Sequence, residues 1–194
     1  MSNVTDLQQA LIWKIPNGGG KAEVWYTHPD LDSIFGPNGI RFADNGRTLL
    51  FAVTLHPFFD PTKILHAKGR IYKISIDKTG KPGKRELIWE GKPGEGPDGF
   101  TIGESGKIYV SLALPEAMMI LSPNGKELNR TPATLEEKLQ QEVSYSSPAN
   151  VAFHGKQVLV TNQDFFVGDP QKHVVFKVYA GEHGKPLFRP YIKQ

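Results

Sequence analysis

The chain has 194 residues, of which 39% are hydrophobic and 10% aromatic, which is enough for one sizeable globular core. It contains no cysteine, which excludes disulfides, thiolate metal sites and a cysteine nucleophile. The formal net charge of +3 is spread along the chain without a basic run, so we expect no nucleic-acid partner.

Neither a secretory signal nor a membrane helix is visible in the sequence. Residues 1–11 lack a basic region followed by an apolar one. No apolar run approaches the roughly 18 residues that a membrane helix needs. We therefore expect a cytoplasmic protein without a membrane partner.

The predicted elements are short strands separated by tight turns. Apolar runs of about 4–6 residues, rich in β-branched and aromatic side chains, alternate with Gly, Pro, Asn and Asp. Two strands, a half blade, come first, and three units of four strands follow. In chain order the predicted half blade and units span 11–27, 36–91, 96–131 and 147–191.

One predicted helix interrupts this pattern. Thr134 followed by Glu137 forms a capping box, the pattern that begins many helices. It predicts a helix that runs to Val143. The helix lies in an insertion over 132–146, between the second and third units.

A short phrase occurs three times, a tight turn that leads into an apolar strand. Its copies are Gly36-Pro37-Asn38-Gly39-Ile40, Gly96-Pro97-Asp98-Gly99-Phe100 and Ser147-Pro148-Ala149-Asn150-Val151. Asn38 and Asp98 are 60 residues apart, Asp98 and Asn150 are 52 apart, and such periods indicate stacked or radial repeats. We therefore predict an all-β fold, a β-propeller with about three and a half four-stranded blades in this chain. A β-sandwich is the alternative.

The repeated phrases also carry oxygen donors. If the repeats surround one axis, the side chains of Asn38, Asp98 and Asn150 converge, and we expect them to be metal ligands. Hard oxygen ligands suit Ca²⁺, the expected metal, with Zn²⁺ or Mg²⁺ as alternatives. Such a metal would polarise a carbonyl and lower the pKa of water, and Asp98 is the candidate catalytic acceptor of the proton. Each of these residues alone is also an ordinary turn residue.

Two long links between strands are the candidate substrate-binding segments. In a propeller, the links between the second and third strands of each unit lie at the same end as the phrases. Loops at a fixed end of a scaffold commonly carry specificity. The alternative is that the phenylalanines pack over the blades and that the histidine is an ordinary surface residue. The candidates are His56, Phe58, Phe59, Asn162, Asp164, Phe165 and Phe166.

The segments that begin with the three phrases resemble one family. GPNGIRFADNGRTLLFA, GPDGFTIGESGKIYVSL and SPANVAFHGKQVLVTN are similar to the senescence marker protein / gluconolactonase (regucalcin-like) superfamily, and the resemblance runs from about Ala10 to the C-terminus. It implies a six-bladed propeller, a divalent metal in the central channel, and hydrolysis of a lactone or related ester. Carried over by position, Asn38 and Asp98 match metal ligands, and Asn150 matches a position near the channel mouth.

The chain also departs from this family. The family has about six blades, whereas this chain has about three and a half, so we expect a partial propeller that lacks the first blades and, with them, the family's first-blade glutamate ligand. Unpaired strands at the two ends of a partial ring invite pairing. We therefore expect either self-association, with two chains closing one ring, or a complementary fragment.

The function predicted from these observations is that of a metal-dependent hydrolase acting on a small-molecule lactone or related ester. A truncated, non-catalytic propeller that serves as a binding or self-associating module is the first alternative. A paraoxonase-like or strictosidine-synthase-like propeller enzyme is the second. The paraoxonase comparison rests on the short segment from Val160 to Phe166.

Overall fold

The structure is a computed structural model that describes residues 2–187 of the 194-residue chain. The described residues form two compact units. Unit 1 runs to Gly94 and also includes Pro186 and Leu187, and unit 2 is Glu95–Lys185. The unit predicted over 147–191 therefore extends, at 188–191, outside the described residues.

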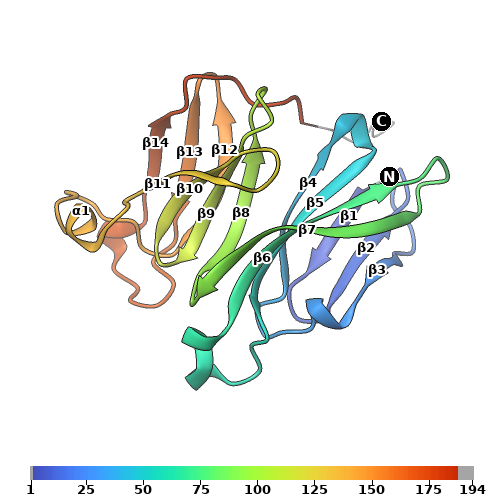
Figure 1. The fold of residues 1–194 in the computed structure, drawn as a ribbon, viewed down its shortest axis with the longest axis horizontal. Coiled ribbons are helices and arrows are strands. Elements are labelled where there is room, and N and C mark those ends of the chain that lie inside the picture. Colours follow the sequence, from blue (N-terminus) through green and yellow to red (C-terminus); the bar gives the residue numbers. More distant parts are fainter. Residues whose placement is uncertain (1, 188–194) are drawn as a thin grey trace. The chain divides into compact units, whose positions relative to one another are not determined.

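Unit 1 consists of two antiparallel sheets in which consecutive strands pair in order (Figure 1). The first sheet has three strands, β1 (Ser2–Asp6), β2 (Leu11–Ile15) and β3 (Glu23–Thr27). The second sheet has four, β4 (Pro37–Ala43), β5 (Thr48–His56), β6 (Lys68–Ile76) and β7 (Pro82–Pro93). Three short 3₁₀ helices lie in the connections, η1 (Pro29–Leu31), η2 (Asp44–Gly46) and η3 (Pro61–His66).

Strand β1 was not predicted from the sequence. Its five residues include only one large apolar side chain, Val4, so they carry no strand pattern. Pairing along the whole of β2, from Ser2 opposite Ile15 to Asp6 opposite Leu11, makes this segment a strand. The Thr5 hydroxyl also donates to the Asn38 carbonyl, at 2.6 Å, which ties β1 to the start of β4.

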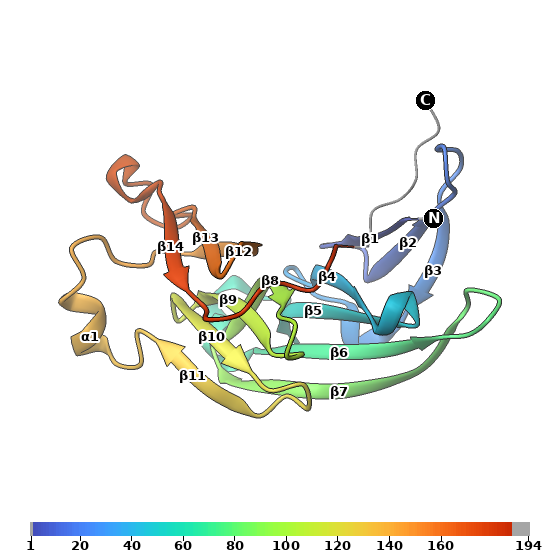
Figure 2. The same ribbon diagram turned by 90° about the horizontal axis from the view of Figure 1, so that it is seen from above.

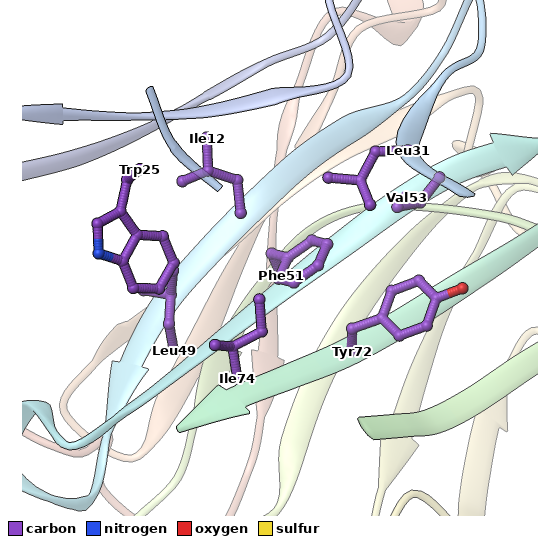
Figure 3. Close-up of a cluster of buried hydrophobic side chains, with 8 residues drawn as sticks. All are labelled: Ile12, Trp25, Leu31, Leu49, Phe51, Val53, Tyr72 and Ile74. Atoms are coloured by element: carbon purple, nitrogen blue, oxygen red, sulfur yellow. The ribbon is translucent and has the colours of Figure 1, made fainter. Parts of the chain in front are cut away.

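The core of unit 1 lies between its two sheets (Figure 3). Alternate residues of β5 point to one face of the sheet, and the paired residues of β6 point the same way. Phe51 stacks on Tyr72 with ring centroids 5.5 Å apart. Burial of each such side chain contributes about 1.5–3 kcal/mol. The cluster is Ile12, Trp25, Leu31, Leu49, Phe51, Val53, Tyr72 and Ile74.

Unit 2 repeats this plan with a four-stranded and a three-stranded sheet. The first contains β8 (Gly96–Ile102), β9 (Ile108–Leu114), β10 (Ala117–Leu121) and β11 (Glu127–Thr131). The second contains β12 (Pro148–His154), β13 (Gln157–Asn162) and β14 (Val175–Tyr179), with η4 (Pro170–Lys172) before β14. Figure 2 shows the consecutive strands of each sheet side by side from a second direction.

The core of unit 2 joins these two sheets through a second buried cluster. Tyr109 of β9 meets Phe153 of β12 edge to face, with ring centroids 5.1 Å apart. Tyr145, in the link before β12, packs on Phe176 of β14 at 4.5 Å. The prediction of an all-β fold is therefore confirmed, because both units consist of antiparallel sheets of consecutive strands.

The helix of unit 2, α1 (Leu135–Leu139), begins where its capping pattern predicts. The Thr134 hydroxyl accepts a hydrogen bond from the Glu137 amide at 3.2 Å. The helix ends four residues before the predicted Val143. It buries none of its own residues, and short helices without packing are marginal, which explains why it extends for little more than one turn.

Candidate functional site

The three repeated phrases share one backbone feature, an extra residue near the start of the strand that each phrase begins, β4, β8 or β12. Two residues lie between Pro37 and Ile40 on β4, but only one lies between their partners Val53 and Phe51 on β5. Such an insertion is a β-bulge, which re-aims side chains and often occurs beside active sites. Asn38 lies within this bulge.

The second and third phrases form bulges of the same size. On β8 the bulge lies between Pro97 and Phe100, whose partners are Leu112 and Val110, and it contains Asp98. On β12 it lies between Pro148 and Asn150, whose partners are the adjacent residues Asn162 and Thr161.

Counting from the proline of each phrase, Asn38, Asp98 and Ala149 are equivalent. Asn150 is one residue further along, opposite Thr161, and so has the position of the glycine in the other two phrases. The structure therefore distinguishes Asn150 from the other two predicted ligands.

Asn38 is held on both sides by threonines of unit 1. Its side-chain amide nitrogen donates to the hydroxyl of buried Thr54 on β5, at 3.1 Å. Its backbone carbonyl accepts from Thr5 of β1. Because the carboxamide is planar, the bond to Thr54 turns the carboxamide oxygen away from that threonine. Asn38 therefore presents an oxygen, the atom type that a hard cation binds.

The strands that carry Asp98 and Asn150 pack together within unit 2. β12 packs on β8, and the Asn150 carboxamide lies directly against Gly99, the residue after Asp98. A Cβ at position 99 would meet the Asn150 side chain and would lie 2.8 Å from the Ala149 carbonyl oxygen. Glycine is therefore required at position 99 by the close approach of the two strands. Whether Asn38, which belongs to unit 1, converges with these residues stays a prediction.

The two phenylalanines of the link after β5 differ in their surroundings. Phe58 is buried and stacks on Phe35, with ring centroids 5.5 Å apart, in a cluster with Leu55 and Ala67. Phe59 is 60% exposed. Phe58 therefore packs as core, whereas Phe59 is accessible. His56 is half-buried, and its Nδ1 lies 2.9 Å from Nη1 of Arg70.

In the link after β13, the polar candidates hold the loop together. The Asn162 side chain accepts from the Ser146 amide at 2.7 Å and donates to the Lys172 carbonyl at 2.8 Å. The buried Asp164 carboxylate accepts from the Ser146 hydroxyl and the Asp169 amide, and the Ser146 bond lowers its pKa. Contact of Asn162 and Asp164 with a substrate stays a prediction.

Phe165 and Phe166 of the same link are 64% and 54% exposed. Their rings meet edge to face, with centroids 5.2 Å apart. The pair is therefore available to contact an apolar group.

Sequence reasoning missed Glu116, which extends the network around Ser146. Its carboxylate accepts from the Ser147 amide and the Ser146 hydroxyl, both at 3.3 Å, and pairs with Lys138 of α1. Glu116, Ser147 and Asp164 all have positive φ, of 70°, 44° and 45°, which non-glycine residues rarely adopt. No sequence signal marks Glu116, because its partners lie 22 to 31 residues away.

The donor set of the phrases fits a hard cation by its chemistry. Asn38, Asp98 and Asn150 supply one carboxylate and two amide oxygens, the ligand types of Ca²⁺ and Mg²⁺ sites. Among residues 2–187, no group of three or more His, Cys, Asp and Glu side chains is placed to hold a metal ion. No helix in the described part of the chain combines the length and the apolar composition that crossing a membrane requires.

Solved structures similar to this one share its fold. Regucalcin from Agrobacterium tumefaciens, a calcium-binding protein, is 23% identical, with a TM-score of 0.61, 95% of this chain covered and 56% of that one. A gluconolactonase from Xanthomonas campestris is 17% identical, with a TM-score of 0.55 and coverage of 78% and 41%. A luciferin-regenerating enzyme is 15% identical, with a TM-score of 0.59 and coverage of 95% and 55%. The chain thus spans about half the length of these structures.

No curated protein matches the chain in sequence, whereas a family model does. Residues 16–159, well over half of the chain, match the family described as "SMP-30/Gluconolactonase/LRE-like region". This match and the shared fold confirm the resemblance and the propeller prediction. The chain belongs to the SMP-30/gluconolactonase/LRE-like family.

Proposed function

We propose that this protein is a metal-dependent hydrolase of lactones or related carboxylic esters. The observation that carries the proposal is the shared β-bulge, which gives Asn38 and Asp98 the same position at the start of their sheets. Two oxygen-donor side chains at equivalent bulges, in a chain of the gluconolactonase family, favour a site over two unrelated turns.

Asp98 and Asn38 are the principal ligands in this proposal, with Asn150 as a third. Similarity to a protein described as calcium-binding supports Ca²⁺ as the metal, with Zn²⁺ or Mg²⁺ as alternatives. A divalent cation supplies Lewis acidity, which polarises the ester carbonyl and lowers the pKa of water.

The protein's own groups perform the remaining steps. The Asp98 carboxylate accepts the proton that the attacking water loses, as a general base. The Thr54 hydroxyl fixes the Asn38 carboxamide, so its oxygen needs little reorientation on binding. Exposed Phe59, Phe165 and Phe166 offer apolar surface for the substrate.

The experiment pairs calorimetry with an assay of lactone hydrolysis. We expect wild type to bind Ca²⁺ and to hydrolyse δ-lactones, and Asp98→Ala to reduce hydrolysis about 10²-fold or more. Asn129→Ala, a change of an exposed residue on β11, is the matched control in unit 2. Unchanged metal binding and hydrolysis in Asp98→Ala would refute the proposal.

A second candidate function is that of a binding or self-associating propeller module without catalysis. The first and last sheets contain three described strands each, whereas the other two contain four. A sheet edge that is left unpaired favours pairing with a second copy or a complementary fragment. Light scattering tests self-association, because a stable monomer across micromolar concentrations contradicts it.

A further inference from the structure

Unit 1 contains a charged pocket that shares only His56 with the predicted site. It has a volume of about 390 Å³ and lies where β6 and β7 meet the end of β5 and η1. The polar groups that line it are Asp30, His56, Arg70, Tyr72, Arg85 and Glu90.

Strand pairing brings these charges together. Residues 70, 72 and 74 of β6 are alternate residues of the strand and so share one face of the sheet. Tyr72 and Ile74 are buried in the core of unit 1, and Arg70 lies on the same face of β6 at the edge of that core. β7 places Glu90 opposite Arg70 and Arg85 opposite Ile74. The pocket is therefore the charged margin of an apolar interface.

The two guanidinium groups are partly desolvated and rigidly held. The Arg70 and Arg85 side chains are 19% and 16% exposed. Arg85 lies over the Tyr72 ring, with Cζ 4.5 Å from the centroid, and donates through Nη2 to Asp30 at 2.5 Å. Arg70 donates through Nε to Glu90 at 3.0 Å. Guanidinium groups fixed in this way are suited to bidentate recognition of an oxyanion.

The arginines of the pocket carry more N–H hydrogen-bond donors than the surrounding acceptors bind. Each arginine side chain carries about five N–H donors and cannot accept a hydrogen bond. Within residues 2–187, the enclosed Nη1 of Arg85 has no hydrogen-bond acceptor. His56 uses its Nδ1 as an acceptor toward Arg70, so it is neutral, and desolvation and Arg70 both lower its pKa.

The charged groups that line the pocket balance one another. Arg70 and Arg85 contribute two positive charges, and Asp30 and Glu90 contribute two negative ones. Lys68, outside the lining, shares Glu90 with Arg70. A buried N–H donor without an acceptor costs free energy, so binding of a ligand that supplies a hydrogen-bond acceptor is favoured.

We propose that this pocket binds a small oxyanion, a carboxylate or a phosphate. The two sources share one recognition chemistry, in which two oxygens face the guanidinium groups of Arg70 and Arg85. The carboxylate alternative rests on the proposed function, because hydrolysis of a lactone releases a hydroxycarboxylate. The phosphate alternative is independent of that function.

The test is a titration of the ¹⁵N-labelled full chain followed by NMR. Gluconate and inorganic phosphate are the anionic probes, and sorbitol is the neutral probe. We expect at least one anion, but not sorbitol, to shift the Arg70 and Arg85 Nε–H resonances, and added salt to weaken the effect. Binding of phosphate alone selects the phosphate source, and binding of gluconate selects the hydroxycarboxylate.

Three variants test whether the anion-induced resonance shifts come from binding in the pocket. Arg85→Gln is expected to weaken anion binding about tenfold or more. Arg47→Gln, at an exposed position on the hairpin between β4 and β5, is the matched control and leaves binding unchanged. Leu87→Glu places a negative charge at the pocket wall without removing a guanidinium, so it tests the proposal even if Arg85→Gln does not fold.

The outcomes distinguish this proposal from the hydrolase proposal. Absence of shifts with both anions, equal shifts with sorbitol, or unchanged binding in Leu87→Glu would overturn the oxyanion site. Each of these results leaves hydrolysis dependent on Asp98. Conversely, loss of the hydrolase proposal leaves the phosphate titration as a valid test of this pocket.

Discussion

The first two phrases and the third build the same backbone from different side chains. Asn38 and Asp98 occupy the bulges of β4 and β8, whereas Ala149 occupies the bulge of β12. The proline before the bulge is present each time, as Pro37, Pro97 and Pro148. The bulge therefore occurs in all three phrases, whereas an oxygen-donor side chain lies within it in only two of them.

The three phrases also differ in what precedes the proline. Gly36 fits against two carbonyls, since a Cβ there would lie 2.5 Å from the Leu31 oxygen and 2.9 Å from the Leu7 oxygen. Ser147 instead belongs to the network of Glu116, Ser146 and Asp164. The third phrase is therefore fixed by polar side chains, whereas the first is fixed by close backbone packing.

The largest expected effect comes from breaking the contact between the second and third phrases. Gly99→Ala forces β8 and β12 apart, because the new Cβ meets the Asn150 carboxamide and the Ala149 carbonyl. We expect a loss of about 1–3 kcal/mol of unfolding free energy, measured by urea denaturation. Asn150→Gly restores part of that loss in the double variant, and strictly additive effects would contradict the contact.

A somewhat smaller effect is expected from Ser146→Ala, which tests how the third phrase is held. The change removes a hydrogen-bond donor from the Asp164 carboxylate, so we expect a smaller loss of unfolding free energy than in Gly99→Ala. Ser144→Ala is the matched control, because Ser144 enters the network only through its backbone carbonyl. Equal stability of the two variants in thermal unfolding would show that the network does not fix this phrase.

A pH-dependent effect is expected in unit 1, at His56. Desolvation and Arg70 lower the pKa of His56, against the raising effects of Asp30, Asp32 and the Pro29 carbonyl. The unfolded chain therefore binds a proton at His56 more readily than the folded chain does. The contribution of His56 to the free energy of unfolding is fully present above pH about 6.5 and is lost as the pH falls below it. His56→Asn keeps an acceptor without titrating. It should flatten the pH dependence of unfolding, and an unchanged profile would exclude His56.

The smallest expected effect concerns the predicted third ligand. Because Asn150 has the position of a glycine in the other phrases, Asn150→Ala should weaken Ca²⁺ binding less than Asp98→Ala or Asn38→Ala. Calorimetry of the three variants gives the order directly. A larger loss in Asn150→Ala than in Asp98→Ala would reverse the distinction between the phrases.

Local patterns predicted the fold class and the positions of the phrases. Proline fixes the turn, and alternating β-branched residues define the strands, so the start of β4 and that of β8 are visible in the sequence. β1 was missed because its strand form depends on pairing with β2 rather than on its own residues. Phe58 and Phe59 are indistinguishable by type, and only the stack with Phe35 buries the former.

Contacts between distant residues explain what else the sequence did not predict. Arg85 meets Asp30 across 55 residues, and Glu116 meets Ser147 across 31. The charged pocket of unit 1 depends on the pairing of β6 with β7, which no motif encodes. The one-residue offset of Asn150 likewise depends on counting from the bulge, whereas the spacing of the donor residues alone suggests equivalence.

The most direct test of the account is an anomalous-scattering map of crystals soaked with Zn²⁺ or Ca²⁺. We expect one strong peak within about 2.0–2.6 Å of the Asp98 carboxylate and the Asn38 carboxamide oxygen. The peak should disappear in Asp98→Ala and persist in Asn129→Ala. A peak elsewhere in the chain, or the absence of any peak at millimolar metal, would contradict the claim that these two bulges form a metal site.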